Sequence, residues 1–106
     1  MGETEIIALN KAQSSFLGIL NRAGKLSVGT DIIKKRRKIA LLLLASDASD
    51  NTKSEMTALA RSVSKKLALV ESKTMLGQPI GYESIAAIGI LDQKCASAFL
   101  EKGRQE

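Results

Sequence analysis

The segment Ile39-Ala40-Leu41-Leu42-Leu43-Leu44-Ala45 gives the strongest indication of the fold. This continuous apolar run lies between Lys38 on one side and Ser46 and Asp47 on the other. A run of this kind is typical of a strand that is buried on both faces, and such a strand needs a sheet with helices on both sides. It is far shorter than the roughly 20 residues that cross a bilayer, so we expect no membrane partner.

The residues before this strand predict a helix, a strand and a second helix. Apolar residues at helical spacing predict a helix from about Thr4 to Arg22, which Gly24 ends as a C-cap glycine. The alternation in Lys25–Val28 predicts a short strand. A short basic helix follows, ending near residue 37, with Thr30 or Asp31 as its N-cap.

The residues after the central strand continue the alternation. Thr52 and Glu55 have the spacing of a capping box, so a third helix is predicted to start near Thr52. Asp92 is placed to cap a final helix. Helix and strand alternate throughout, which predicts an α/β fold with helices on both sides of a small sheet. The other predicted elements are a strand over 67–70, a helical turn over 74–78 and a strand over 85–91.

The composition excludes several classes of function. Without histidine and with the single cysteine Cys95, the chain can build neither a histidine-based active site nor a Cys/His metal site. Three aromatic residues are too few for a base-stacking platform. A length of 106 residues predicts one domain, 1–106. Glu3 and Glu5 stand where a signal peptide would be positively charged, so we expect a cytoplasmic protein.

The positive charge is concentrated in one segment. The net charge is +5, and Arg22 to Lys38 contains seven basic residues against one acidic residue, Asp31. Residues 39–106 carry eight of each sign. Clustered positive charge indicates a polyanionic partner if it is not simply a solvated surface, and the charge alone leaves both interpretations open.

Three segments carry short motifs in a fixed order: Ala23-Gly-Lys-Leu26, Ala45-Ser-Asp-Ala48 and Ser72-Lys-Thr-Met-Leu-Gly77. Together with their flanks, Phe16–Leu26, Leu43–Thr52 and Val70–Gly81, they resemble the superfamily of kink-turn-binding ribosomal proteins of the large-subunit seven-Ae type. The resemblance is closest to small bacterial members. It implies a three-layer α/β/α sandwich around a four-stranded mixed sheet, and binding to structured RNA.

The superfamily binds RNA through a motif of the form G-x-N-E-x-x-K at the start of its second helix. Gly29 matches the glycine of this motif and Lys35 its lysine, while Asp31 takes the Asn place and Ile32 the Glu place. A helix N-terminus followed by a lysine suits phosphate. Ile32 cannot accept a hydrogen bond from a base edge, so we expect kink-turn recognition weaker than is usual in the superfamily.

Further contacts are implied by the resemblance. Lys73 matches a lysine that touches the RNA backbone, and Lys53 falls where the superfamily approaches RNA. The loop from Gly81 to Ala87 matches one that covers an extruded nucleotide, and here it offers Tyr82 and Ile85. The predicted RNA-binding residues are Lys25, Gly29, Thr30, Asp31, Lys34, Lys35, Arg36, Lys38, Lys53, Lys73, Tyr82 and Ile85.

We therefore expect a monomeric, ribosomal-protein-like RNA-binding protein without catalysis or cofactor. Its expected partners are structured RNA, taken to be ribosomal, and ribosome-associated proteins. One alternative is a protein-interaction module on the same scaffold, because Asp31 and Ile32 break the motif. A weaker alternative is an enzyme that uses carboxylates such as Asp47, although we favour a bond from Asp47 to backbone N–H groups. Cys95 is expected to be a buried, inert thiol.

Overall fold

A five-stranded mixed sheet forms the middle of the molecule, in a computed structural model that describes residues 6–103. In sheet order the strands are β1 (Ile6–Ile7), β4 (Lys66–Val70), β3 (Leu41–Ala45), β5 (Ala87–Ile90) and β2 (Leu26–Val28). The β1–β4 and β3–β4 pairs are parallel, while β5 is antiparallel to both β3 and β2. The α/β prediction is confirmed, with five strands rather than four because the two-residue β1 is added at one edge.

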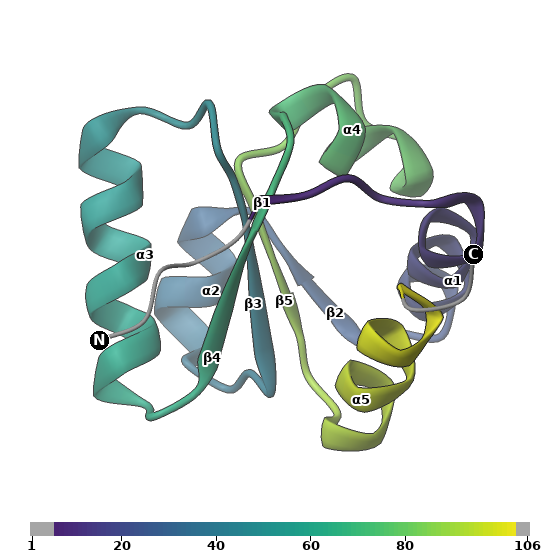
Figure 1. The fold of residues 1–106 in the computed structure, drawn as a ribbon. Coiled ribbons are helices and arrows are strands. Elements are labelled where there is room, and N and C mark those ends of the chain that lie inside the picture. The colour runs from purple at the N-terminus through teal and green to yellow at the C-terminus, as the bar shows by residue number, and fades with distance from the viewer. Residues whose placement is uncertain (1–5, 104–106) are drawn as a thin grey trace.

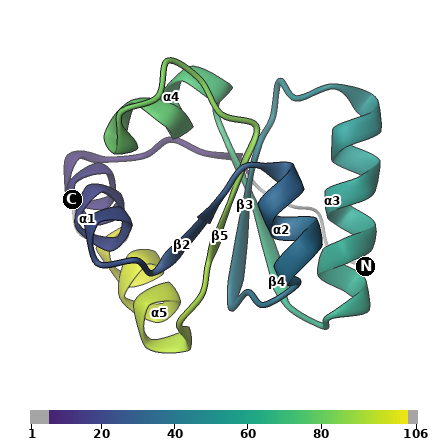
Figure 2. The same cartoon turned by 180° about the vertical axis from the view of Figure 1, so that it is seen from behind.

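Helices cover both faces of this sheet (Figures 1 and 2). One face carries α2 (Thr30–Arg36) and α3 (Asp50–Ser62). The other carries α1 (Lys11–Arg22) and α5 (Gln93–Lys102), together with α4 (Lys73–Gly77) and the 3₁₀ turn η1 (Gln78–Ile80). This is the three-layer α/β/α sandwich that the resemblance implied. Within residues 6–103, none of the helices combines the length and apolar character that a bilayer crossing requires.

The central strand β3 is buried along its whole length, as its apolar run predicts. All five of its side chains lie inside, and it pairs with β4 on one side and β5 on the other. Since both faces of a pleated strand carry side chains, two helical layers are needed to remove these residues from water. The β3 leucines thus form the centre of the core.

The prediction of a helix from about Thr4 is wrong, and Thr4 itself lies outside the described residues. Ile6 and Ile7 pair with Leu69 and Val70 as β1, and α1 begins only at Lys11. The reason is a capping box: the Asn10 side chain accepts from the Gln13 N–H at 2.7 Å, and the Gln13 side chain accepts from the Asn10 N–H at 3.3 Å. Apolar residues at helical spacing occur on both sides of this capping box, so the spacing does not show where the helix begins.

The capping box also fastens α1 to α5. Gln13 is 2% exposed, and its Nε2 donates to the Phe99 carbonyl at 3.2 Å. Asn10 Nδ2 donates to the Lys102 carbonyl at 2.9 Å. Both polar side chains are therefore paired at a helix–helix contact where an unpaired amide would be costly.

Two other predicted caps are replaced by neighbouring residues. The N-cap of α3 is Ser49, whose hydroxyl accepts from the Thr52 N–H at 3.2 Å, so the predicted box of Thr52 and Glu55 is wrong. The N-cap of α2 is Gly29 rather than Thr30 or Asp31. In both helices the first turn starts earlier than the apolar pattern indicates.

Other predicted helix ends are confirmed. Gly24 has a φ of +73°, and the Lys25 N–H donates back to the Leu20 carbonyl at 2.9 Å, as in a glycine-terminated helix. Asp92 caps α5 by accepting from the Lys94 N–H at 2.8 Å.

The ends of the strands lie along two opposite sides of the sheet, which we call the upper edge and the lower edge. At the upper edge in Figure 1, β2, β3 and β4 end and β5 begins, so α2, α3 and α4 all start there. At the lower edge, α2 and α3 end and α5 starts. The five-residue strands β3 and β4 separate the two edges by about 15 Å.

Candidate nucleic-acid interface

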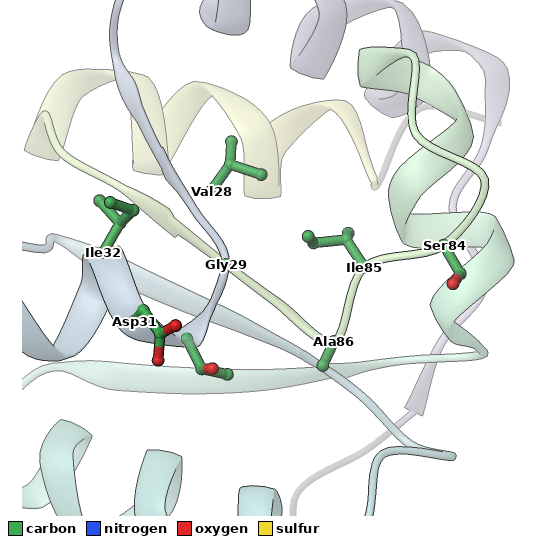
Figure 3. Close-up of a pocket in the computed structure, with 8 residues that line it drawn as sticks. Val28, Gly29, Asp31, Ile32, Ser84, Ile85 and Ala86 are labelled. Atoms are coloured by element: carbon green, nitrogen blue, oxygen red, sulfur yellow. The ribbon is translucent and has the colours of Figure 1, made fainter.

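A pocket of about 480 Å³ opens at the upper edge, where β2 passes into α2. Two segments far apart in the sequence form it, the turn over 28–32 and the end of the loop over 81–86 (Figure 3). In the close-up the side chains of Val28 and Ile85 point toward one another, while that of Ser84 points away. The lining residues are Val28, Gly29, Thr30, Asp31, Ile32, Ser84, Ile85 and Ala86.

Gly29 makes the turn from β2 into α2. Its φ of 95° and ψ of 150° lie in a region that is essentially reserved for glycine. Its N–H donates to the Ala87 carbonyl at 3.0 Å, and its carbonyl accepts from the Ile33 N–H at 3.1 Å. Among the residues that the structure describes, no side chain caps α2, so the N–H groups of its first turn are open to an acceptor, although Asp31 places a carboxylate in the same turn.

Ile32 and Ile33 have opposite environments. Ile33 is fully buried beneath α2, whereas Ile32 is 42% exposed and lines the pocket. Ile32 has therefore not turned inward to fill the core of the short second helix. An apolar side chain stands beside the pocket at the position where the superfamily motif has Glu.

The loop over 81–86 is seated on α4. The Tyr82 N–H donates to the Gly77 carbonyl at 3.0 Å, and the Ile85 N–H donates to the Lys73 carbonyl at 3.1 Å. Ile85 is half-buried in the pocket wall, while the Tyr82 side chain is 48% exposed. Tyr82 thus does not pack back onto the sheet edge.

The predicted cations of α2 do not form a single cluster. Lys34 faces α3, where its Nζ lies 3.3 Å from Glu55 Oε1. Lys35 and Arg36 are exposed near the end of α2, and within the described residues neither is paired with a carboxylate. Lys38 follows α2 and lies at the lower edge.

Lys25, Lys53 and Lys73 lie in three different places. Lys25 precedes β2 at the lower edge, and its Nζ lies 3.9 Å from Asp92 Oδ2. Lys53 lies on α3 and lines a separate depression with Thr57 and Arg61. Lys73 starts α4 and holds the loop that carries Ile85. The upper edge therefore brings together Gly29, Thr30, Asp31, Lys73, Tyr82 and Ile85.

The polar groups that follow β3 serve the backbone. Asp47 Oδ1 accepts from the Lys73 N–H at 2.9 Å, and the Ser46 hydroxyl donates to the Glu71 carbonyl at 2.6 Å. The predicted role of Asp47 in binding a backbone N–H is confirmed. Cys95 is a free thiol that is half-buried rather than fully buried. Among residues 6–103, no three His, Cys, Asp or Glu side chains gather where a metal ion could sit.

Val28, Ser84 and Ala86 complete the pocket but were not among the predicted RNA-binding residues. Val28 was assigned only to a strand, whereas Ser84 and Ala86 lie in the loop that the resemblance matches to a nucleotide-covering loop. The pairing of β2 with β5 places Val28 opposite Ile88 and so brings the two segments together. The alternating pattern around Val28 predicts a strand, but it does not indicate which strand pairs with it.

The chain is similar to proteins of two Bacillus species, and no family model matches it. It is 34% identical over 87 residues to "RNA-binding protein YlxQ" of Bacillus subtilis (strain 168), an alignment that covers 79% of this chain and 87% of that protein. It also matches the solved structure of a protein with unknown function from Bacillus halodurans, with a TM-score of 0.81 and 25% identity. That match covers 91% of this chain and all of the other.

Proposed function

The chain belongs to the ribosomal-protein-like family of RNA-binding protein YlxQ, and from that premise we propose that it binds structured RNA of the kink-turn type. The observation that carries the proposal is the pocket at the upper edge, which joins the start of α2 to the loop over 81–86. A bent RNA could place a phosphate against the first turn of α2 and an extruded base against this loop. We further propose that this RNA is ribosomal and that the protein acts as a monomer in the cytoplasm.

Each part of the upper edge has a role in this proposal. The uncapped N–H groups of α2 receive a phosphate or base acceptor. Tyr82 offers a face on which a base can stack, and Ile85 forms an apolar wall. Ile32 contacts the RNA without accepting a hydrogen bond, so selectivity rests on shape more than on base edges.

The cations beyond the pocket supply affinity that does not depend on sequence. Lys35 and Arg36 are exposed on α2, and Lys73 lies beside the loop at the upper edge. If about four to six phosphates are contacted, the logarithm of the binding constant falls with the logarithm of salt with a slope of about −3 to −5. Lys34 contributes less, because Glu55 neutralises it.

Fluorescence anisotropy with two labelled RNAs tests the proposal. One contains a kink-turn, and the other has the same length and a continuous helix in its place. We expect tighter binding of the kink-turn RNA, and a slope shallower by about two in Lys35→Ala/Arg36→Ala. Lys11→Ala is the matched control, since Lys11 is exposed on α1 across the sheet from α2. Absence of binding, or an equal effect of the control, would overturn the proposal.

The exposure of Ile32 and Tyr82 favours one second candidate, a protein-interaction module. Two large apolar side chains at one edge suit a protein partner as well as a base. In that case the two RNAs bind weakly and alike, while a partner protein is retained after nuclease treatment and lost in Ile32→Ser/Tyr82→Ser.

A further inference from the structure

The lower edge of the sheet carries a second group of cations, about 15 Å from the pocket. Arg37 and Lys38 follow the last turn of α2, while Lys65 lies between α3 and β4 and Lys66 is the first residue of β4. All four side chains belong to exposed residues. We call Arg37, Lys38, Lys65 and Lys66 the lower basic patch.

Two adjoining depressions lie beneath this patch, with volumes of about 390 and 350 Å³. They share Ala40, Lys65 and Gln93, so they lie side by side between the end of α2 and the start of α5. Ser64 and Ser97 add hydroxyl groups to the wall of the smaller one. Lysine, serine and glutamine side chains are groups that proteins use to contact phosphate and sugar oxygens.

No acidic side chain of residues 6–103 neutralises the patch. Of the described residues that line the two depressions, none is Asp or Glu. Nor is any of the four cations in an ion pair with a described carboxylate. Asp92, next to Gln93, is already engaged by Lys25 at 3.9 Å and by the Lys94 N–H at 2.8 Å.

The backbone that carries these cations is fixed in place. Arg37 ends α2 in the left-handed region, and its guanidinium donates to the Ser62 hydroxyl at 2.6 Å. The Lys65 N–H donates to the Ala60 carbonyl at 2.9 Å, and Lys66 begins β4. A ligand therefore meets a patch whose backbone is already ordered, which lowers the entropic cost of binding.

We propose that the lower basic patch is a second RNA-binding surface, which grips the phosphate backbone of a single strand without reading its bases. The proposal rests on the RNA-binding function proposed above. Neither depression is lined by an aromatic side chain among the described residues, so base stacking adds nothing there. With the pocket at the opposite edge, one protein could hold a folded RNA and a neighbouring strand together.

A two-probe titration tests this surface. The protein is first saturated with unlabelled kink-turn RNA, and a short labelled oligouridylate is then added and followed by fluorescence anisotropy. We expect the oligouridylate to bind the preloaded protein. In Lys65→Ala/Lys66→Ala the salt slope for this probe should be shallower by about 1.4, because each phosphate contact on a single strand contributes about 0.7. Lys65→Arg/Lys66→Arg should retain binding, and Lys11→Ala should leave it unchanged.

The outcomes separate the two proposals. If the protein does not bind kink-turn RNA but still binds oligouridylate in a way that depends on Lys65 and Lys66, only the proposed role of the upper pocket is refuted. An oligouridylate signal unchanged in Lys65→Ala/Lys66→Ala, or one abolished by preloading, would overturn the second surface. Binding of an acidic peptide of equal charge in place of the oligouridylate would also overturn it and assign the patch to a protein partner. Melting temperatures equal to that of the parent protein verify that each variant is folded.

Discussion

Replacing Gly29 with Asn should destabilise the protein and weaken RNA binding together. Gly29 has φ 95° and ψ 150°, a conformation that costs a side-chain-bearing residue about 1–3 kcal/mol. The space around it is not the obstacle, since a Cβ there would meet only Ile85 Cδ1 at 4.0 Å. The backbone cost thus dominates, since the capping advantage of Asn over Gly at an N-cap is only a few tenths of a kcal/mol. It acts on the residue that sets the direction of the first turn of α2.

Gly81 provides a matched control within the same chain. Its φ of 85° and ψ of 17° lie in the left-handed helical region, which Asn adopts readily, and a Cβ there has no atom within 4 Å. Gly81→Asn should therefore cost less than about 1 kcal/mol. A loss of 1 kcal/mol lowers the melting temperature of a domain of this size by about 4 °C, so Gly29→Asn should lower it by about 4–12 °C.

Circular dichroism melts measure the stability of both variants, and anisotropy well below their melting temperatures measures kink-turn affinity. We expect Gly29→Asn to be the less stable variant and to bind more weakly than the parent protein. Equal stability of the two variants would refute the conformational reasoning. A destabilised Gly29→Asn with undiminished affinity would refute the role of this turn in RNA binding.

Three further predictions concern side chains. Ile32→Glu should bind kink-turn RNA more tightly, by up to about 1–3 kcal/mol, at an unchanged melting temperature, because Ile32 is half-exposed; unchanged affinity in anisotropy titrations contradicts it. Tyr82→Ala should weaken RNA binding by about 1–3 kcal/mol without loss of stability, because Tyr82 is exposed. Ile85→Ala should also lower the melting temperature, because Ile85 is half-buried, and equal melting temperatures of the two variants would contradict this difference. Gln13→Ala should cost about 1–3 kcal/mol in urea unfolding, because it leaves the buried Phe99 carbonyl unpaired, and a loss below 0.5 kcal/mol would contradict this.

The sequence predicted the elements whose signals are local. The apolar run of β3 predicted a doubly covered strand, and Gly24 and Asp92 predicted helix ends that the structure confirms. These features depend on residues close together in the chain. The helices on both faces followed from the β3 run and from the alternation of helix and strand, while the mixed character of the sheet came from the resemblance, which the similarity to YlxQ supports at the level of the family.

What could not be predicted depends on contacts between distant residues. Gln13 reads as a polar interruption of an amphipathic helix until α5 lies against it. The positive charge was assigned by adding up the charges of whole segments. Residues 39–106 have no net charge, so Lys65 and Lys66 were not recognised as part of a basic patch. Only the lower edge of the sheet places them beside Arg37 and Lys38. Likewise, Lys34 looks like a free cation until α3 brings Glu55 to it.

The position of β5 between β3 and β2 also has a consequence for the timing of synthesis. In the described sheet, β2 has β5 as its partner strand, and the upper pocket needs both the turn at Gly29 and the loop that leads into β5. Roughly sixty residues separate these segments, and at about 5–20 residues per second a ribosome takes about 3–12 s to translate them. A nascent chain that already displays the basic second helix therefore has no pocket. In the proposed function, the unfinished protein attracts RNA by charge alone, and recognition by shape begins only after β5 has paired between β3 and β2.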